Sequence, residues 1–179
     1  MKICVITGSA RGKGTSSRLA DAFIKGAEAA GHDVFRFDAP FHRVHPCISC
    51  NTCRKGGTKA CMFGDDMRTI LVPKLIEADA VVFASPIYFA GLSAQIKAVI
   101  DRFYGYVDDI KGNKKTALLL SFGDETLGSA EGAILTYRHM ADYLGWENRG
   151  VLTAIGCYTP DDLLASDFLY RAVQMGATI

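Results

Sequence analysis

The feature that most constrains the fold is a regular alternation of apolar, strand-length runs with segments of helical periodicity. Two of the runs, Val81–Ala84 and Ala117–Leu120, are apolar at every position, as expected for parallel strands covered by helices on both faces. Strands are predicted at Lys2–Thr7, Asp33–Phe37, Ala80–Ala84, Lys115–Phe122 and Val151–Ile155. Helices are predicted at Thr15–Ala30, Asp66–Glu77, Leu92–Val107, Ser129–Leu144 and Pro160–Met175. Five βα units in succession predict an α/β fold with a doubly wound, five-stranded parallel sheet between two layers of helices.

Residues at the element boundaries support this assignment. Gly31 follows the first helix as a C-terminal capping glycine, and Thr159 precedes Pro160 and two acidic residues as an N-cap. With 179 residues and 49% hydrophobic content, the chain is long enough for one sizeable core and short for two. We therefore expect a single domain over residues 1–179, with one irregular, cysteine-rich insertion at about residues 39–65.

The charge balance bears on the partners of the chain. Twenty Lys and Arg against nineteen Asp and Glu give a formal net charge of +1, and the two signs are interleaved. This pattern disfavours nucleic acid and anionic membrane surfaces, so we expect small molecules or proteins as partners. No run approaches the roughly 18 apolar residues of a membrane span, and we expect a cytoplasmic protein. In that compartment disulfides are disfavoured, and Cys4 and Cys157 are interpreted as buried core residues.

The loop after the first predicted strand, residues 8–17, is a candidate phosphate site. In open α/β sheets, ligands bind beyond the carboxyl ends of the strands. The glycine spacing of this loop fits neither a P-loop nor a dinucleotide fingerprint. It does lead several hydroxyl groups into a helix N-terminus, whose free N–H groups and dipole suit a phosphate monoester. The alternative is a capped helix with a solvated loop. The hydroxyl residues are Ser9, Thr15, Ser16 and Ser17.

The loop after the third predicted strand offers a surface for a planar ring. Pro86 stiffens the exit from the strand, and Ile87, Tyr88 and Phe89 supply flat apolar groups. Gly91 is expected to let the backbone turn close to a ligand. A core role is the alternative for the aromatic pair, but its place opposite the phosphate loop favours a ligand site. The loop after the fourth strand, residues 121–126, adds more backbone and hydroxyl groups.

Four cysteines, Cys47, Cys50, Cys53 and Cys61, fall within fifteen residues. Three cysteines at successive three-residue spacings and a fourth beyond a flexible spacer are close to ferredoxin-type cluster ligation. Structural zinc usually takes two separated pairs, although a zinc clip with His42 and His45 as spare ligands is an alternative. Free or redox-cycling thiols are a third interpretation. The nearby cations would offset the charge of an anionic cluster or are simply solvated; they are Arg54, Lys55 and Lys59.

These motifs together resemble one known family. They are Gly8-Ser9-x-Arg11 leading into Thr15-Ser16, Ser85-Pro86-Ile87-Tyr88, Gly91-x-Ser93-x-Gln95-x-Lys97, and the cysteine run followed by Asp65-Asp66-Met67. In this combination the chain is similar to the NADPH-dependent FMN reductase family of flavodoxin-like proteins, and within it to the iron-sulfur flavoproteins. The resemblance implies a flavodoxin-like sheet of order 2-1-3-4-5, and dimers or tetramers. It also implies a four-iron, four-sulfur cluster on Cys47, Cys50, Cys53 and Cys61, near a flavin.

The resemblance also assigns the FMN site. The phosphate is expected in the first loop and the isoalloxazine ring against the third, with support from the fourth. The residues so assigned are Ser9, Arg11, Gly14, Thr15, Ser16, Ser17, Pro86, Ile87, Tyr88, Phe89, Gly91, Ser121 and Gly123. We expect FMN rather than FAD, because no dinucleotide fingerprint is present to hold a pyrophosphate.

The function expected from these features is an NAD(P)H-dependent FMN oxidoreductase. The flavin performs the difficult chemistry, so no side chain is assigned as a catalytic acid, base or nucleophile. The molecule that accepts electrons from the flavin is expected to be a small molecule or a redox protein such as a ferredoxin. The alternative is a non-enzymatic electron carrier that docks on redox partners. Dedicated flavodoxin carriers are usually acidic, and the net charge of +1 counts against that alternative.

Overall fold

The structure is a computed structural model and describes residues 1–55 and 61–179. Its strands are β1 (Lys2–Thr7), β2 (Asp33–Asp38), β3 (Ala80–Tyr88), β4 (Gly91–Leu92), β5 (Lys115–Ser121) and β6 (Glu147–Ala154). Its α-helices are α1 (Thr15–Ala29), α2 (Val72–Glu77), α3 (Ala94–Arg102), α4 (Val107–Ile110), α5 (Glu131–Leu144), α6 (Pro160–Leu164) and α7 (Phe168–Ala177). Short 3₁₀ turns lie at Ala39–Phe41, Thr52–Arg54, Phe103–Gly105 and Leu127–Ala130.

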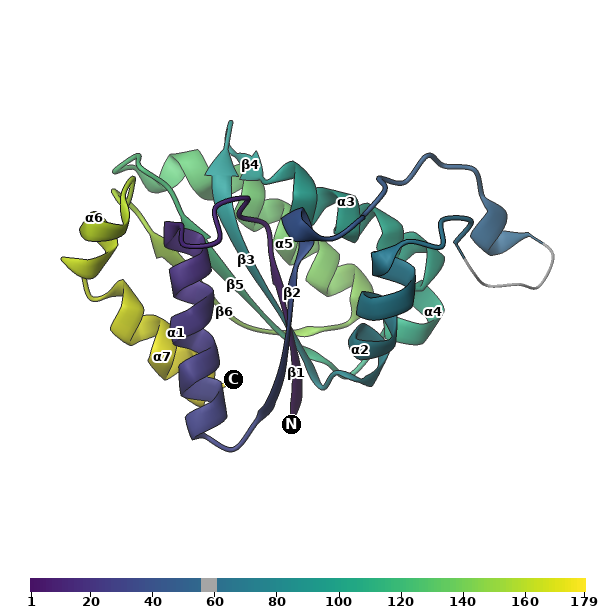
Figure 1. Ribbon diagram of the computed structural model, residues 1–179, viewed down its shortest axis with the longest axis horizontal. Coiled ribbons are helices and arrows are strands. Elements are labelled where there is room, and N and C mark those ends of the chain that lie inside the picture. Colours follow the sequence, from purple (N-terminus) through teal and green to yellow (C-terminus); the bar gives the residue numbers. More distant parts are fainter. Residues whose placement is uncertain (56–60) are drawn as a thin grey trace.

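The sheet has the predicted order. The five long strands pair in parallel as β2-β1-β3-β5-β6, which is the order 2-1-3-4-5 (Figure 1). The predicted number of strands was wrong, since the sheet has six strands within the described residues. The additional strand, β4, is two residues long and pairs antiparallel with the end of β3. β4 pairs with β3 because a tight turn reverses the chain between them. It was not predicted because a strand of two residues has no recognisable apolar pattern.

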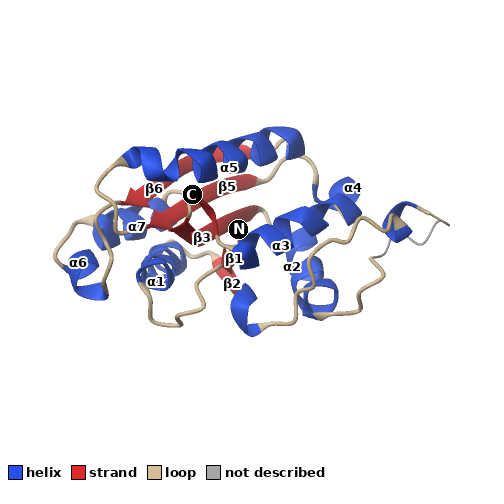
Figure 2. Ribbon diagram, turned by 90° about the horizontal axis from the view of Figure 1, so that it is seen from above, coloured by secondary structure: helices blue, strands red, loops and turns tan. Residues whose placement is uncertain are grey.

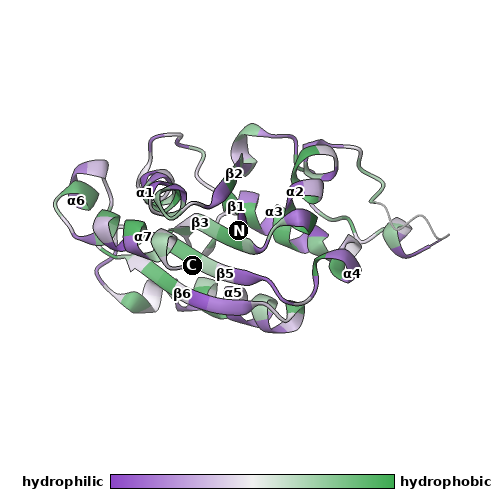
Figure 3. Cartoon of the chain, turned by 90° about the horizontal axis from the view of Figure 1, so that it is seen from below, coloured by the Kyte–Doolittle hydropathy of each residue, from purple (hydrophilic) through white to green (hydrophobic). Residues whose placement is uncertain are grey.

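Helices cover both faces of the sheet and give it three layers. α1 and α7 lie on one face, and α2, α3 and α5 lie on the other (Figure 2). Alternate residues of the central strands therefore enter different cores: Val82 packs with α1 and α7, whereas Val81 and Phe83 pack with the other helices. Figure 3 shows hydrophobic and hydrophilic residues together on the flanking helices, as expected for helices half-buried against a sheet.

Several helix boundaries differ from those predicted. The third predicted helix begins at Ala94, where Ser93 caps it through a hydrogen bond from the Ile96 N–H, and it ends at Arg102. The second begins as a π-helical turn, Met67–Leu71, because Pro73 has no N–H to donate to the preceding turn. The last is divided into α6 and α7. The start of β6 was missed because its first residues are polar and exposed.

The predicted caps are confirmed. Gly31 has a left-handed backbone, with φ of +81°, after the end of α1. Thr159 and Asp162 form a capping box at the start of α6, in which each side chain accepts a hydrogen bond from the backbone N–H of the other residue. Apart from its short 3₁₀ turns, the described part of the 39–65 segment is irregular and extends beyond the sheet (Figure 1).

Two glycines bring α1 and α7 unusually close together. A Cβ added to Gly26 would lie 1.9 Å from the Val173 carbonyl oxygen, and one added to Gly176 would lie 2.0 Å from that of Phe23. Backbone therefore packs against backbone along this helix pair. None of the helices in residues 1–55 and 61–179 combines the length and apolarity that crossing a lipid bilayer requires.

We predict that Gly26→Ala lowers the free energy of unfolding by about 1–3 kcal/mol, because the added methyl group forces the two backbones apart. This loss outweighs the gain in helix propensity of up to about 1 kcal/mol. The measurement is urea unfolding followed by circular dichroism. Gly128→Ala is the control, since a Cβ there meets no atom within 4 Å. Equal stability of the two variants would contradict the close packing.

Candidate functional site

A cavity of about 540 Å³ opens at the carboxyl ends of β1, β3, β5 and β6, along the upper edge of the sheet in Figure 1. Its size is within the range typical of small-molecule sites. Most of the predicted residues line it: Ser9, Arg11, Gly14, Thr15, Ser16, Pro86, Ile87, Tyr88, Ser121 and Gly123. Three predicted residues, Ser17, Phe89 and Gly91, do not. The cavity also includes residues that the sequence interpretation missed: Lys13, Phe122, Cys157, Tyr158 and Pro160.

The N-terminus of α1 forms one end of this cavity. Its N-cap is Gly14, and no side chain caps the helix by a hydrogen bond. The N–H groups of the first turn are therefore free of a side-chain acceptor, and the helix dipole favours an anion there. A Cβ on Gly14 would lie 3.1 Å from the Ser9 Oγ, so a larger residue would crowd this end of the cavity. The Ser9 hydroxyl donates to the Arg11 carbonyl oxygen at 3.0 Å and accepts from the Arg11 N–H at 3.2 Å, which fixes the loop.

Ser17 supports the loop from behind instead of facing the cavity. Its Oγ donates to the Gly12 carbonyl oxygen at 2.9 Å and accepts from the Arg36 Nη2 at 2.7 Å. Arg36 also pairs with Asp21 and Asp38. Burial would raise the pKa of Asp38, but hydrogen bonds from Arg36 and Thr7 bring it below its usual value. The hydroxyl of Ser17 is thus already engaged on both sides.

The other end of the cavity is lined by apolar and aromatic groups. Pro86 and Ile87 are half-buried, and Tyr88 is 54% exposed beside them. Tyr158 faces the loop after β5, where a Cβ on Gly123 would lie 2.9 Å from the Tyr158 ring. Across the base, the hydroxyls of Thr15 and Ser121 are 2.7 Å apart and join the loop after β1 to the end of β5. The combination is a polar end and a flat apolar end in one cavity.

The turn between β3 and β4 is built differently from the prediction. Positive φ angles occur at Phe89 (+47°) and Ala90 (+61°), which form the two central positions of a tight hairpin. Gly91 has no positive φ, and a Cβ there would meet its nearest atom at 3.7 Å. Neither strain nor crowding within the chain therefore requires glycine at position 91. Phe89 is fully exposed at the hairpin tip and does not line the cavity.

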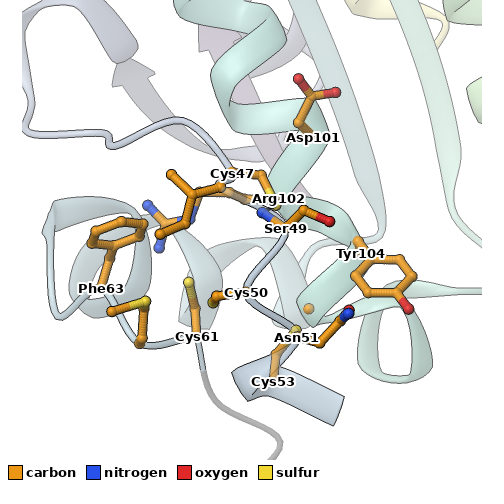
Figure 4. Close-up of a pocket in the computed structure, with 13 residues that line it drawn as sticks. Cys47, Ser49, Cys50, Asn51, Cys53, Cys61, Phe63, Asp101, Arg102 and Tyr104 are labelled. Carbon is orange, nitrogen blue, oxygen red and sulfur yellow. Dashed lines mark hydrogen bonds between the residues drawn. The ribbon is translucent and has the colours of Figure 1, made fainter.

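A second cavity, of about 380 Å³, lies beside the irregular segment and is lined by its cysteines. Cys47, Cys50, Cys53 and Cys61 all line it, together with Arg102 and Tyr104 (Figure 4). Hydrogen bonds from Thr52 lower the pKa of the exposed Cys50 thiol. Within the described residues, no three or more His, Cys, Asp or Glu side chains converge closely enough to hold a single metal ion.

His42 and His45 do not line the cysteine cavity. The His42 ring stacks on Phe37 with 4.3 Å between ring centroids, and the His45 ring stacks on Phe63 at 4.7 Å. Both imidazoles therefore pack as parts of the loop structure. This arrangement does not support the alternative in which they serve as spare zinc ligands.

A buried ion pair anchors the irregular segment to α3. The Arg102 Nη1 donates to the Asp65 carboxylate, and the side chains are 1% and 4% exposed. The same carboxylate accepts a hydrogen bond from the His45 N–H at 2.9 Å. Burial alone would raise the pKa of Asp65, but Arg102 and the backbone donors bring it below its usual value. The two ends of the cysteine segment are thereby tied to each other and to α3.

Arg102 has further hydrogen-bonding capacity that the pair with Asp65 does not use. Its Nε and Nη2 are buried and have no hydrogen-bond partner among the described residues. The buried Tyr106 hydroxyl likewise has no hydrogen-bond partner among the described residues. Arg54, by contrast, donates to Asp108 and to the Tyr104 carbonyl oxygen, each at 2.8 Å. Lys59, which the sequence also suggested as a compensating cation, lies outside the described residues.

The chain belongs to the NADPH-dependent FMN reductase family, whose model matches residues 1–151. The predicted resemblance to this family is confirmed. An iron-sulfur flavoprotein of Archaeoglobus fulgidus is 36% identical over 133 residues, which are 72% of this chain and 65% of that protein. A second iron-sulfur flavoprotein of that organism is 34% identical over 126 residues, or 69% of this chain and 56% of that protein. The chain thus spans less than two thirds of the length of these relatives.

A solved structure is similar over nearly the whole chain. The NAD(P)H:quinone oxidoreductase from Methanothermobacter marburgensis aligns with a TM-score of 0.71 and 22% identity, covering 99% of this chain and 96% of that one. At that identity the likeness shows the fold alone. The flavodoxin-like fold predicted from the sequence is confirmed.

We predict that Asp65→Asn lowers the free energy of unfolding by about 3–5 kcal/mol at pH 7, because it leaves the Arg102 charge buried without its partner. The pKa of Asp65 is lower in the folded chain than in the unfolded chain. Its stabilising contribution is therefore fully present above about pH 4 and is lost as the pH falls through the folded pKa. The difference between wild type and variant should narrow in acid.

The measurement is urea unfolding at pH 7 and at the lowest pH where both proteins remain folded. Asp101→Asn is the matched control. Asp101 precedes Arg102 on α3, and its carboxylate pairs with Lys97 at the surface. That change should cost only a few tenths of a kcal/mol. A loss for Asp65→Asn as small as that of the control would show that the buried pair does not anchor the segment.

Proposed function

We propose that this protein is an FMN-dependent oxidoreductase that takes electrons from NAD(P)H and passes them to a small-molecule or protein acceptor. The observation that carries the proposal is the first cavity, in which an uncapped helix N-terminus faces flat apolar groups across the carboxyl edge of the sheet. These two ends suit the phosphate and the ring of FMN. Membership in the family supports the same choice of cofactor.

Each part of the cavity has a role in holding FMN. The first-turn N–H groups of α1 and the hydroxyls of Thr15 and Ser16 would bind the phosphate, with Arg11 and Lys13 adding positive charge. Ser9 lines the same end of the cavity, and its hydroxyl is engaged by the backbone of Arg11. Pro86, Ile87 and Tyr88 would support the ring, together with the backbone at Ser121 and Gly123. Ser17 acts indirectly, by holding the loop through Gly12 and Arg36. Bound FMN supplies hydride and electron transfer at its N5 atom.

The cysteine cavity is proposed to hold a four-iron, four-sulfur cluster on Cys47, Cys50, Cys53 and Cys61. All four residues line one cavity, and the Archaeoglobus fulgidus relatives are named iron-sulfur flavoproteins. In such a cluster each thiolate binds a different iron atom, so the sulfurs stand farther apart than around a single ion. Side chains that surround a cavity without converging on one point are compatible with that geometry.

The two cavities share no lining residue. Helix α3, nine residues and about 13 Å long, connects their surroundings. Its N-cap, Ser93, donates to Ser85, which precedes Pro86 of the first cavity, and its last residues, Asp101 and Arg102, line the second. Electron exchange between a flavin and a cluster in these positions remains a prediction. So do a homodimeric or homotetrameric assembly and a cytoplasmic location.

Spectroscopy of protein purified without oxygen tests both cofactors. FMN released by heat should be identified by chromatography, and a recovered FAD would overturn the assignment of the cofactor. Bleaching of the flavin absorbance by NADH or NADPH is expected for the enzyme. Reduction only by a reduced redox protein such as a ferredoxin would favour the electron-carrier alternative.

We predict that Ser16→Ala weakens FMN binding by about 10- to 100-fold, since one hydrogen bond to a charged group contributes about 1.5–3 kcal/mol. The dissociation constant is measured by titrating apoprotein with FMN and following flavin fluorescence. Thr136→Ala is the control, because the Thr136 hydroxyl bonds only within α5, to the Gly132 carbonyl oxygen. Equal FMN affinity in wild type and Ser16→Ala would place the phosphate elsewhere.

A further inference from the structure

We propose that Arg102 compensates the negative charge of the cluster and donates hydrogen bonds to its sulfur atoms through Nε and Nη2. This inference rests on the proposed cluster and assigns a role to a side chain outside the cysteine motif. Arg102 is the last residue of α3, whereas the proposed ligands lie between residues 47 and 61. Only the fold brings them to one cavity (Figure 4).

The burial of Arg102 is the first argument. The residue is 2% exposed, so its guanidinium has lost nearly all contact with water. A buried charge is tolerated only when it is paired and hydrogen-bonded. The pair with Asp65 and a hydrogen bond to the His45 carbonyl oxygen use Nη1 alone. The guanidinium also lies over the Phe63 ring, 5.6 Å from its centroid, but its other two nitrogens have no hydrogen-bond acceptor among the described residues.

The position of the unpartnered donors is the second argument. Arg102 lines the cavity that holds the four cysteines, and its Nε and Nη2 have no partner within residues 1–55 and 61–179. The Tyr106 hydroxyl, four residues further along the chain, is also buried and has no partner there. A buried donor without an acceptor costs about 1–3 kcal/mol, and more when it is charged. An occupant rich in acceptors would satisfy these groups.

The chemistry of the cluster meets that requirement. Four thiolates outweigh the positive charge of an iron-sulfur core, so the cluster is an anion whose sulfurs accept hydrogen bonds. One-electron reduction adds a further negative charge. A fixed cation at van der Waals range therefore stabilises the reduced cluster more than the oxidised one and raises its reduction potential.

Arg54, which follows Cys53 in the sequence, is less suited to the role. The Arg54 side chain is one-third exposed, forms a salt bridge with the exposed Asp108 and lies over the Tyr104 ring. Its Nη1 donates to Asp108 and its Nη2 donates to the Tyr104 carbonyl oxygen. Arg54→Gln therefore provides a matched control, in which an arginine next to a proposed ligand is removed without touching the buried pair.

The test compares cluster content and reduction potential in four proteins reconstituted with iron and sulfide without oxygen. They are wild type, Arg54→Gln, Arg102→Lys, and the double variant Asp65→Asn with Arg102→Gln. The double variant removes both buried charges, so it avoids the destabilisation of an unpaired Asp65. Iron is measured chemically, and a dithionite titration followed by electron paramagnetic resonance reports the cluster. Circular dichroism and FMN content report folding.

We expect the double variant to show at least a tenfold lower ratio of reduced to oxidised cluster at a given solution potential, which corresponds to about 59 mV. Arg102→Lys keeps the charge and should stay within about threefold of wild type, as should Arg54→Gln. An unchanged ratio in the double variant would overturn the inference. Loss of the cluster from the folded double variant, with retention in Arg102→Lys, would support it; loss from both would reduce Arg102 to an anchor of the loop.

The failure of the cluster proposal itself has a different result. In that case wild type would take up no more iron than a variant with Cys50→Ser and Cys53→Ser, whatever residue occupies position 102. The two proposals are therefore distinguished by the same set of samples.

Discussion

The buried pair of Asp65 and Arg102 is the constraint on which the arrangement of the cysteine segment depends. Removing two charges from water is expensive, and the cost is recovered only if they meet each other and fill their remaining hydrogen-bonding positions. Asp65 does this by accepting from Arg102 and from the His45 N–H. Because His45 precedes the cysteines and Asp65 follows them, one carboxylate closes the base of the segment. The cysteines between His45 and Asp65 are therefore held next to the C-terminal end of α3.

Helix α3 connects the buried pair to the surroundings of the first cavity. At its beginning, the Ser93 N–H donates to the Ser85 Oγ at 3.0 Å, next to the residues that lead into the apolar end of the first cavity. A Cβ on Gly8 would lie 2.2 Å from the Ser93 Oγ, so glycine alone lets the loop after β1 start directly against this helix. The position of α3 is therefore set by contacts at both ends. A displacement of the helix would alter the two cavities together.

The sequence predicted those parts of the structure that local pattern determines. Runs that are apolar on both faces, together with capped helices, identified a doubly wound parallel sheet, and glycine with hydroxyl residues identified the loop after β1. The order of the strands followed only from the resemblance to flavodoxin-like proteins. Pattern could not identify Arg102, because a cation at a helix C-terminus is ordinarily a surface residue. Ser17 was wrongly assigned to the cavity, because the sequence does not show which hydroxyls of one helical turn bond to other parts of the chain. In the structure the Ser17 hydroxyl accepts a hydrogen bond from Arg36. Tyr158 was missed because only the loops after the first, third and fourth strands were considered.

The hairpin between β3 and β4 shows how the apolar end of the first cavity is held in place. Left-handed backbone at two non-glycine residues, Phe89 and Ala90, costs of order 1–3 kcal/mol each and persists only where surrounding structure enforces it. The pairing of Ile87 with Leu92 supplies part of that enforcement. Gly132 of α5 supplies another part, since a Cβ there would lie 2.8 Å from the Ala90 carbonyl oxygen. The strain lies at the tip, outside the cavity, and the residue that precedes it, Tyr88, is thereby held in the extended conformation of β3 at the cavity edge.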